Sequence, residues 1–418
     1  MELRKEILEI AKKAKAASSF MVTLSAEEKN KVLKDMSLAL IACQVDLIKA
    51  NKKDILKAKR SKMHPAMIDR LALTEKRIAD MAESLIELTK LADPVGEVIK
   101  AWRRPNGLWI HKVRTPIGVI AIIYESRPNV TSDCIGLSIK SGNCVILRGG
   151  SDALNSNLAI FKALSSVLKK YNIPGPVINL IARPEHKAVD ILLKQKDFID
   201  LVIPRGGESL IRRVVQLSSI PVIKHYKGVC HVFVDEWADL NMAENICYNA
   251  KVQRPGVCNA MESMLVHRDV AARFLPGMIK KFRSAGVEVR GCSMTKRIVK
   301  DVKPATEKDY HTEYLGLVLS VKVVDTLQNA IDRINHYGTH HSDSIITENY
   351  ENALEFLRKV DSACVYVNAS TRFTDGYQFG MGAEIGISTD KLHARGPMAL
   401  EELTTYKFMV FGHGQVRQ

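Results

Sequence analysis

Residues 117–125 have the sequence IGVIAIIYE, an unbroken apolar run that ends in an acidic residue. A strand without polar alternation is typical of a parallel sheet whose two faces are both covered by helices. The next residues fit such a sheet, because 131–142 predict a helix that ends at a glycine and 143–150 (NCVILRGG) predict a second apolar strand. The stretch therefore predicts the start of a doubly wound α/β domain.

Strand and helix patterns keep alternating along the rest of the chain. Strands are predicted at 175–181, 197–207, 220–226, 229–235, 287–292, 315–325, 342–347 and 362–368, with a further apolar run at 261–267. Helices are predicted at 152–171, 184–195, 208–219, 241–252, 269–286, 326–338 and 349–360. With 418 residues, the chain is too long for one small core, so two α/β domains are expected.

The two ends of the sequence have a different pattern. The first 92 residues predict helices, one of which begins at the capping box of residues 25–28 (SAEE) and another at Thr74. Residues 98–103 and 108–114 predict a β-hairpin around a Pro-Asn-Gly turn. Residues 404–412 (TTYKFMVFG) predict a late strand without a local partner, from which we expect a dimer or a larger assembly.

Composition excludes several classes of protein. The apolar runs are shorter than the ~20 residues that span a bilayer, and the amino terminus lacks the apolar block of a secretory signal. The eight cysteines include no CxxC pair, so neither a disulfide scaffold nor a metal site is expected. We expect a cytoplasmic protein.

The net charge of +15 has two interpretations: a nucleic-acid binder, or an enzyme with an anionic substrate or cofactor. The basic residues of the amino-terminal region follow helical patterns, without blocks of like charge or interleaved aromatic residues. This pattern favours the enzyme, with neither nucleic acid nor membrane as a partner.

Cys258 differs from the other cysteines in its setting. In KVQRPGVCNA, residues 251–260, it follows a Pro-Gly break and lies four residues after Arg254. Cys144 and Cys364, by contrast, belong to apolar runs in which a thiol is usually a small hydrophobe. A cation near a loop thiol can stabilise a nucleophilic thiolate, although a structural thiol remains the alternative from these residues alone.

Two Gly-Gly turns indicate where phosphates could bind. The sequence has neither a P-loop nor a G-x-G-x-x-G fingerprint after its first α/β strand. Instead, Arg148 precedes one Gly-Gly pair, and Arg205 precedes Gly206 and Gly207, each between a strand and a helix. Backbone N–H groups at a helix start, with an arginine beside them, predict a site for a phosphate-bearing cofactor.

A third polar cluster lies in residues 368–386. It contains Ser370, Thr371 and Arg372 among many glycines. Hydroxyl groups and a guanidinium suit a carboxylate or a phosphate, whereas a long surface loop is the alternative.

Seven motifs carry a resemblance to a known family: YESRPNVT, NCVILRGG, IPRGGESL, GVCHVFVD, QRPGVCNAMESMLVH, HYGTHHSDSIIT and VNASTRFTDGYQFGMGAEIGISTDKLHARGPMALEELTTYK. Over nearly the whole chain, the sequence resembles the gamma-glutamyl phosphate reductases of the aldehyde dehydrogenase superfamily. The resemblance implies an aldehyde dehydrogenase-like α/β fold, with two doubly wound domains and a small β oligomerisation element. It implies NADPH-dependent reduction of L-glutamyl 5-phosphate to L-glutamate 5-semialdehyde through a cysteine thioester, the second step of proline biosynthesis from glutamate.

The same resemblance assigns roles to residues. It makes Cys258 the catalytic thiol, Asn129 an oxyanion-hole donor and Glu313 the residue that holds the nicotinamide ribose. It places Arg148 and the turn of Arg205, Gly206 and Gly207 on the adenosine-phosphate side of the NADPH site. The substrate is expected to be held by Arg254, Ser370, Thr371 and Arg372.

The implied domains are an NADP-binding domain at 1–96 and 116–230, a catalytic domain at 231–389, and an oligomerisation element at 97–115 and 390–418. We expect a homo-oligomer, and functional coupling to glutamate 5-kinase stays open.

Three positions depart from what we expect of relatives. Hydrolytic members of the superfamily carry a water-activating glutamate in an ELGG motif, where this chain has HYKG, residues 225–228. Its absence argues against the main rival, a non-phosphorylating aldehyde oxidase. Gly256 stands where serine is expected in the family, and Tyr377 where glycine is expected, which leaves the shape of the substrate pocket open.

Overall fold

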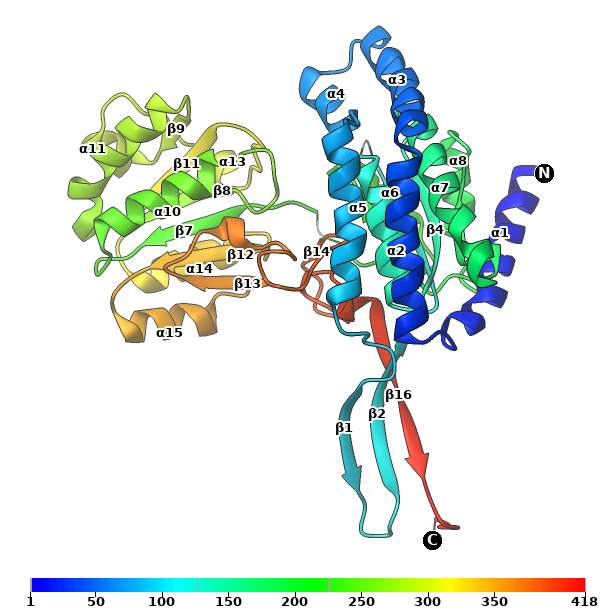
Figure 1. Ribbon diagram of the computed structural model, residues 1–418. Coiled ribbons are helices and arrows are strands. Elements are labelled where there is room, and N and C mark those ends of the chain that lie inside the picture. The colour runs from blue at the N-terminus through cyan, green and yellow to red at the C-terminus, as the bar shows by residue number, and fades with distance from the viewer. Residues whose placement is uncertain (1, 126, 225, 418) are drawn as a thin grey trace. The chain divides into compact units, whose positions relative to one another are not determined.

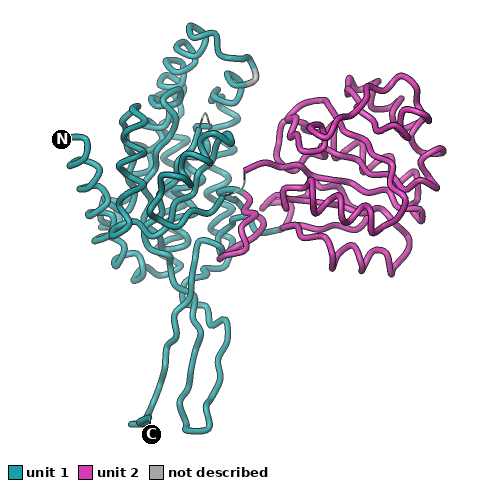
Figure 2. Tube along the Cα trace, turned by 180° about the vertical axis from the view of Figure 1, so that it is seen from behind, with its two compact units in different colours: residues 1–224, 380–386, 398–418 teal, residues 225–379, 387–397 magenta. Residues whose placement is uncertain are grey.

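The computed structural model describes residues 2–125, 127–224 and 226–417. The chain forms two compact units, coloured separately in Figure 2. Unit 1 comprises Met1–Lys224, Gly380–Gly386 and Met398–Gln418, and unit 2 comprises His225–Phe379 and Ile387–Pro397. Unit 2 is thus an insertion in the sequence of unit 1.

A four-stranded parallel sheet forms the centre of unit 1. Its order is β5-β4-β3-β6, with β3 at Val119–Tyr124, β4 at Cys144–Gly149, β5 at Ile178–Leu180 and β6 at Leu201–Arg205. The stretch that predicted this sheet became β3, which is buried along its whole length. The prediction of a strand at 220–226 is wrong for its described residues, 220–224 and 226, among which Val222 makes only an isolated bridge to Val202. Its neighbour Pro221 has no N–H group with which to continue a ladder.

Helices cover this sheet in layers (Figure 1). Helices α6 and α7 pack together, α2 and α5 pack on them, and α1 contacts β4. The capping box at Ser25 and the N-cap at Thr74 are both confirmed. The α-helices of unit 1 are α1 (Glu2–Met21), α2 (Ala26–Ala42), α3 (Gln44–Arg60), α4 (Pro65–Leu71), α5 (Glu75–Lys90), α6 (Asn129–Lys140), α7 (Leu154–Leu168), α8 (His186–Leu192) and α9 (Glu208–Leu217).

Unit 2 is built on a seven-stranded parallel sheet of order β10-β9-β11-β8-β7-β12-β13. Its central strands β7 and β8 are fully buried, as their apolar sequences predict. The strands are β7 (Cys230–Val234), β8 (Met261–His267), β9 (Glu288–Gly291), β10 (Lys303–Pro304), β11 (Val318–Val324), β12 (Ser342–Ile346) and β13 (Cys364–Val367). The helices are α10 (Leu240–Val252), α11 (Arg268–Ser284), α12 (Ser293–Ile298), α13 (Glu307–Tyr310), α14 (Leu327–Tyr337) and α15 (Tyr350–Lys359). Two parallel sheets with helices confirm the predicted fold class.

A separate antiparallel sheet of order β1-β2-β16 extends from the body of unit 1 (Figure 1). Strands β1 (Val98–Arg103) and β2 (Trp109–Pro116) form the predicted hairpin. Strand β16 (Thr404–Phe411) pairs with β2 along its whole length. The prediction that this strand has no local partner is confirmed, because its partner β2 lies almost 300 residues earlier in the sequence. A short antiparallel pair in unit 2, β14 (Ile387–Ser388) and β15 (Gly396–Pro397), completes the strands.

Among the described residues, no helix is both long and apolar enough to cross a membrane.

A buried ion pair in unit 1 yields a test of stability. Lys29 has no exposed side-chain surface, and its Nζ lies 2.8 Å from Asp93 Oδ2. Lys29→Ala should lower the free energy of unfolding by about 3–5 kcal/mol, because it leaves the Asp93 carboxylate, which is only 10% exposed, without its cation. Lys31→Ala is the matched control: its pair with Glu27 on the same helix is exposed, so the loss should stay below about 0.5 kcal/mol. Urea denaturation followed by circular dichroism measures both, and equal losses would contradict the expectation.

Candidate active site

Cys258 lies half-buried in the loop between α10 and β8, at the amino end of a central strand. The neighbouring strand β7 begins just after Gly228, and the two backbones touch there. A Cβ atom on Gly228 would lie 1.8 Å from the carbonyl oxygen of Cys258, so only glycine fits. The N–H group of Gly228 also donates to Glu313 Oε1 at 2.9 Å. Two of the predicted site residues, Cys258 and Glu313, therefore both contact Gly228.

A buried polar network lies beneath this loop. The thiol of Cys230 donates to the carbonyl oxygen of Cys258 at 3.2 Å and lies 3.8 Å from His341 Nδ1. His341 Nδ1 is 2.8 Å from Ser342 Oγ, which lies 2.6 Å from Thr374 Oγ1. Burial raises the pKa of Cys230 well above its usual range, so this second cysteine stays a neutral thiol. Of these two neighbouring cysteines, the partly exposed Cys258 is the one that can meet a substrate.

The segment 370–374 packs against Asn259, the residue that follows Cys258. Thr371 Oγ1 donates to the carbonyl oxygen of Asn259 at 2.7 Å, and Asn259 Nδ2 donates to the carbonyl oxygen of Thr374 at 2.8 Å. Arg372 Nη1 donates to Asn259 Oδ1. The predicted substrate cluster thus lies beside the loop of Cys258.

The members of this cluster differ in how far they are open to a ligand. Ser370 and Thr371 are buried and bonded within the protein: the Ser370 hydroxyl oxygen accepts the N–H of Arg372 at 3.3 Å. Arg254 is exposed, and Arg372 is partly exposed. Burial, helped by the charge of Arg254, lowers the pKa of Arg372. The two guanidinium groups are therefore the parts of the cluster best suited to hold an anionic substrate, while the two hydroxyls shape the loop.

Four of the predicted cofactor residues, Arg148, Arg205, Gly206 and Gly207, lie at one edge of the sheet in unit 1, whereas Glu313 belongs to unit 2. Arg148 is the last residue but one of β4, and Arg205 is the last residue of β6. These two strands flank β3. The strand order changes direction here, since the chain passes from β3 through β4 and β5 and then returns to the other side of β3. Ligands of doubly wound sheets bind at this switch point, outside the carboxyl ends of the strands.

Gly206 and Gly207 form the turn between β6 and α9, and the side chain of Glu125 contacts this turn. Gly207 donates its N–H to Glu125 Oε2 at 2.9 Å, and Glu125 N–H donates to the carbonyl oxygen of Arg205 at 3.1 Å. A Cβ atom on Gly206 would lie 2.4 Å from the same Glu125 oxygen. The helix start therefore binds an anionic oxygen here, the chemistry that a cofactor phosphate requires.

Arg148 provides the second indication that this edge fits a phosphate-bearing cofactor. Its Nη2 donates to the carbonyl oxygen of Pro184 at 3.0 Å, while its Nε is buried without a hydrogen-bond partner. Burial lowers the pKa of Arg148, and nearby Asp152 and Glu125 act against that shift. A buried guanidinium with an unused donor fits an anionic group of a dinucleotide.

Asn129 is the first residue of α6 in unit 1, and its side chain is fixed by the next turn of the helix. Its Nδ2 donates to Asp133 Oδ2 at 3.2 Å, and Ser84 Oγ lies 3.2 Å from Asp133 Oδ1. Burial raises the pKa of Asp133 to about 6. One N–H of the Asn129 amide is thus held by Asp133, and its other N–H is free to point elsewhere.

One group of potential metal ligands exists among the described residues. Donor atoms of Glu236, His267 and Asp269 all lie within 4.8 Å of one another. His267 already has a structural role there, since it is the N-cap of α11 and its Nδ1 accepts the N–H of Asp269 at 3.4 Å.

Sequence reasoning missed Glu125, Asp133 and Cys230. A signal existed for Glu125, the acidic residue directly after the apolar run of β3 at the edge where ligands bind. Asp133 lies one helical turn after Asn129, a spacing at which side chains meet. Cys230 belongs to an apolar strand and offers no such signal. The departure from the ELGG motif at 225–228 lies partly outside the described residues, because His225 is not among them.

Comparison with known proteins gives a family and close relatives. A family model described as the aldehyde dehydrogenase family matches residues 3–290 and 285–409. The gamma-glutamyl phosphate reductase of Thermodesulfovibrio yellowstonii is 56% identical over 418 residues, 100% of both chains. The crystal structure of gamma-glutamyl phosphate reductase from Thermotoga maritima is 50% identical and has a TM-score of 0.97, covering 99% of this chain and 100% of that chain.

A more distant structure shares the fold. Glyceraldehyde-3-phosphate dehydrogenase GapN from Methanocaldococcus jannaschii, complexed with NADP, is 18% identical with a TM-score of 0.69. The match covers 98% of this chain and 94% of that chain.

The contact at Gly228 leads to a test that needs no substrate. Gly228→Ala should lower the free energy of unfolding of unit 2 by about 1–3 kcal/mol, because the new methyl group overlaps the Cys258 carbonyl. Urea denaturation followed by the fluorescence of Trp237 reports on unit 2, since Trp102 and Trp109 lie in unit 1.

Gly277→Ala is the matched control in the same unit. Nothing lies within 4 Å of its added Cβ, and alanine in a helix should stabilise by up to about 1 kcal/mol. If Gly228→Ala were as stable as this control, the close approach at Cys258 would be refuted.

Proposed function

Because the chain belongs to the aldehyde dehydrogenase family and, within it, to the gamma-glutamyl phosphate reductases, we propose that it reduces L-glutamyl 5-phosphate to L-glutamate 5-semialdehyde and phosphate with NADPH. This is the second step of proline biosynthesis from glutamate. The observation that carries the proposal is the half-buried thiol of Cys258 at the amino end of β8, with the guanidinium of Arg372 bound to the adjacent Asn259. A nucleophile beside a cationic group suits an acyl phosphate.

In the proposed mechanism, the thiolate of Cys258 attacks the acyl carbon of the substrate. A C–S bond forms, the C–O bond to phosphate breaks, and phosphate leaves with the electron pair. The backbone N–H of Cys258 and the amide of Asn129 are the proposed donors to the tetrahedral oxyanion. Arg254 and Arg372 hold anionic groups of the substrate. The product of this step is a thioester on Cys258.

NADPH, when bound, supplies the hydride that reduces the thioester carbon. Arg148, with the turn of Arg205, Gly206 and Gly207, would hold its phosphates, and Glu313 would hold the nicotinamide ribose. Collapse of the resulting thiohemiacetal anion breaks the C–S bond, releases the aldehyde and returns the thiolate of Cys258. We assign NADP binding to residues 1–96 and 116–230, and catalysis to residues 231–389.

Phosphate dependence distinguishes this reaction from aldehyde oxidation to an acid. In the proposed enzyme, no glutamate stands at residue 225 to activate water, so the thioester survives until hydride or phosphate attacks it. Coupling to glutamate 5-kinase is proposed for a related reason: an acyl phosphate hydrolyses readily in water, and direct delivery would limit that loss.

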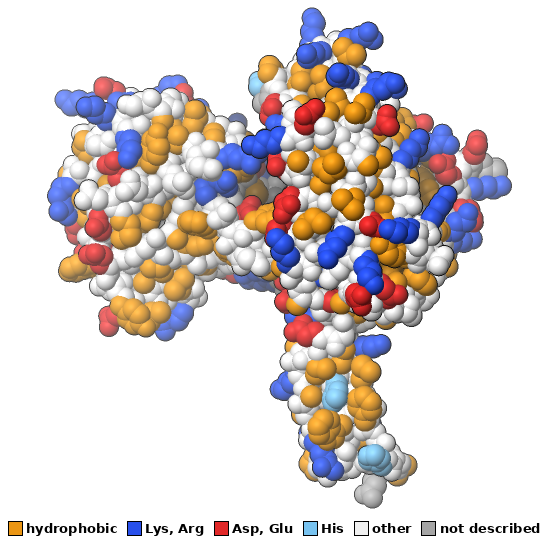
Figure 3. All heavy atoms as spheres, in the orientation of Figure 1, with side chains coloured by type: hydrophobic (Ala, Val, Ile, Leu, Met, Phe, Trp, Pro, Cys, Tyr) orange, Lys and Arg blue, Asp and Glu red, His pale blue; other side chains and the backbone are white. Residues whose placement is uncertain are grey.

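We also propose that 97–115 and 390–418 include an oligomerisation element, the sheet β1-β2-β16. Strands β1 and β16 are its two open edges, with unpaired backbone groups. Apolar side chains cover its exposed surface, seen as the orange spheres on this sheet in Figure 3. They include Trp109, Tyr406, Phe408, Met409, Val410 and Phe411, each at least 40% exposed. Exposed apolar surface of this kind marks an interaction site.

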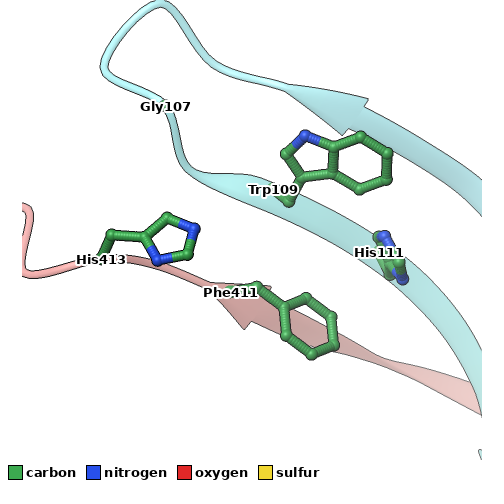
Figure 4. A pocket seen from close by; sticks show the side chains of 5 residues that line it. All are labelled: Gly107, Trp109, His111, Phe411 and His413. Atoms are coloured by element: carbon green, nitrogen blue, oxygen red, sulfur yellow. The ribbon is translucent and has the colours of Figure 1, made fainter.

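A hollow of about 330 Å³ lies at the far end of this sheet (Figure 4). Trp109 and His111 of β2 face it beside Phe411 of β16. Their rings are in contact but tilted: the centroids of Trp109 and His111 are 5.5 Å apart with the planes at 56°, and those of His111 and Phe411 are 5.1 Å apart with the planes at 59°. An aromatic hollow suits a side chain from a second copy of the chain.

The catalytic prediction concerns Cys258→Ala. This variant should lose at least roughly 10⁴-fold in turnover, because no covalent intermediate can form, yet should bind NADPH as the wild type does. The assay is the reverse reaction, formation of NADPH from L-glutamate 5-semialdehyde, NADP and inorganic phosphate. Wild-type turnover should depend on phosphate.

Cys292→Ala is a matched control, since this buried cysteine lies at the end of β9 in the same unit. Equal turnover of the Cys258→Ala variant and the wild type, or fast turnover of the wild type without phosphate, would disprove the proposed reaction.

The assembly prediction concerns β16. Replacing Phe408 and Val410 together by lysine should convert the oligomer to single chains, because two charges would be buried in the apolar contact. Sedimentation velocity measures this. Leu357→Lys, at an exposed apolar position of α15, is the control and should leave assembly unchanged. Identical sedimentation of the double variant and the wild type would refute this interface.

A further inference from the structure

A Lys–Glu ion pair is buried at the base of the loop that carries Cys258. Lys251 lies in the last turn of α10, and Glu262 is the second residue of β8. Lys251 Nζ donates to Glu262 Oε2 at 2.5 Å, and neither side chain has exposed surface. Residues 252–261, with Cys258 among them, form the chain between the two partners. The ion pair therefore closes this loop where it leaves α10 and enters β8.

The other carboxylate oxygen of Glu262 holds a second loop. Leu315 N–H donates to Glu262 Oε1 at 3.0 Å. Leu315 has a φ of +51°, a left-handed conformation that a leucine adopts only with support from its surroundings. Two residues earlier, Glu313 accepts the N–H of Gly228, which lies against the carbonyl of Cys258. Glu262 is thus linked to Cys258 along the nucleophile loop and, by way of Leu315, through the loop of Glu313.

Stability alone does not account for a charged pair at this place. Removing two charges from water generally costs more than their attraction returns, and apolar side chains of similar size do as well or better. Burial raises the pKa of Glu262 to about 7 and lowers the pKa of Lys251, two shifts with the same cause. Their sequence neighbours Ala250 and Met261 belong to an apolar core cluster. The pair adds a fixed orientation of the Glu262 carboxylate, because each of its two oxygens accepts a hydrogen bond.

We propose that Lys251 and Glu262 are positioning residues, which fix the loop of Cys258 and the loop of Glu313 in one arrangement. The inference deepens the proposed function and rests on it. Hydride can reach the thioester only if the thiol of Cys258 and the ribose-binding Glu313 keep a fixed separation. The Lys251–Glu262 pair sets that separation by holding both loops, without touching substrate or cofactor. Its loss should therefore lower kcat more than it raises KM.

The main test replaces the pair by apolar side chains of similar length, Lys251→Met with Glu262→Met. This double variant should melt near the wild-type temperature, because the buried charges are gone together. Its kcat in the semialdehyde assay should fall at least about tenfold, with KM within about threefold, because the reacting groups lose their alignment. A double variant with the melting temperature and the kcat of the wild type would show that the pair contributes only side-chain volume, and would overturn the proposal.

A conservative double variant distinguishes the effect of the hydrogen bonds of Glu262 from the effect of side-chain volume. Lys251→Met with Glu262→Gln is also neutral, but the glutamine oxygen can still accept the N–H of Leu315. Its kcat should exceed that of the Met–Met variant several-fold. Equal kcat values would count against a directional role. Lys281→Met, which removes a surface pair of 2.6 Å between Lys281 and Glu244, is the control and should change neither kcat nor KM.

Hydrogen exchange tests the inference without any enzymatic reaction. In the Met–Met variant, amides of residues 311–317 and 252–261 should exchange at least about tenfold faster than in the wild type, while those of α15 stay unchanged. Unchanged exchange in both loops would overturn the proposal. A wild type without turnover would instead refute the proposed function, and exchange would still decide whether the pair fixes the loops.

Discussion

The contact between Gly228 and the carbonyl oxygen of Cys258 is the constraint on which the site in unit 2 depends. Parallel strands β7 and β8 are neighbours, and their amino ends come so close that no side chain fits at residue 228. The same glycine donates its N–H to Glu313, so the proposed nucleophile Cys258 and the proposed ribose ligand Glu313 both contact Gly228. The position of the Cys258 loop is therefore fixed against the segment that leads into β7.

The amino edge of this sheet is unusually polar for a buried region. Cys230, His341, Ser342 and Thr374 form a connected network under the nucleophile loop, and Tyr366 hydroxyl joins it at 2.7 Å from Thr374 Oγ1. Such a network is stabilising only when its members are satisfied together, since each unpaired buried group costs free energy. The network therefore favours one arrangement of the edge, the role that we propose for the Lys251–Glu262 pair at the two neighbouring loops.

Local sequence patterns predicted most of the fold. The site could not be predicted in full, because it depends on contacts between residues that are distant in the sequence. The apolar run of β3, the capping box at Ser25 and the hairpin turn before β2 are short-range signals, and each predicted its element. The partner of β16 could not be found in this way, because pairing with β2 depends on the closure of a chain of almost 300 residues. The setting of Cys258 was visible as a Pro-Gly break beside an arginine. Its support was not, since Gly228 and Glu262 acquire their roles only when β7, β8 and the loop before β11 are adjacent.

The insertion of unit 2 into unit 1 determines the order in which the chain can fold during synthesis. Residues 225–379 leave the ribosome before residues 404–411, so unit 2 can complete its sheet while unit 1 still lacks β16. Until then, β2 has one open edge that a nascent neighbour on the same messenger RNA could occupy. The late arrival of β16 therefore exposes each chain, for the seconds that translation takes, to strand exchange with its polysome neighbours.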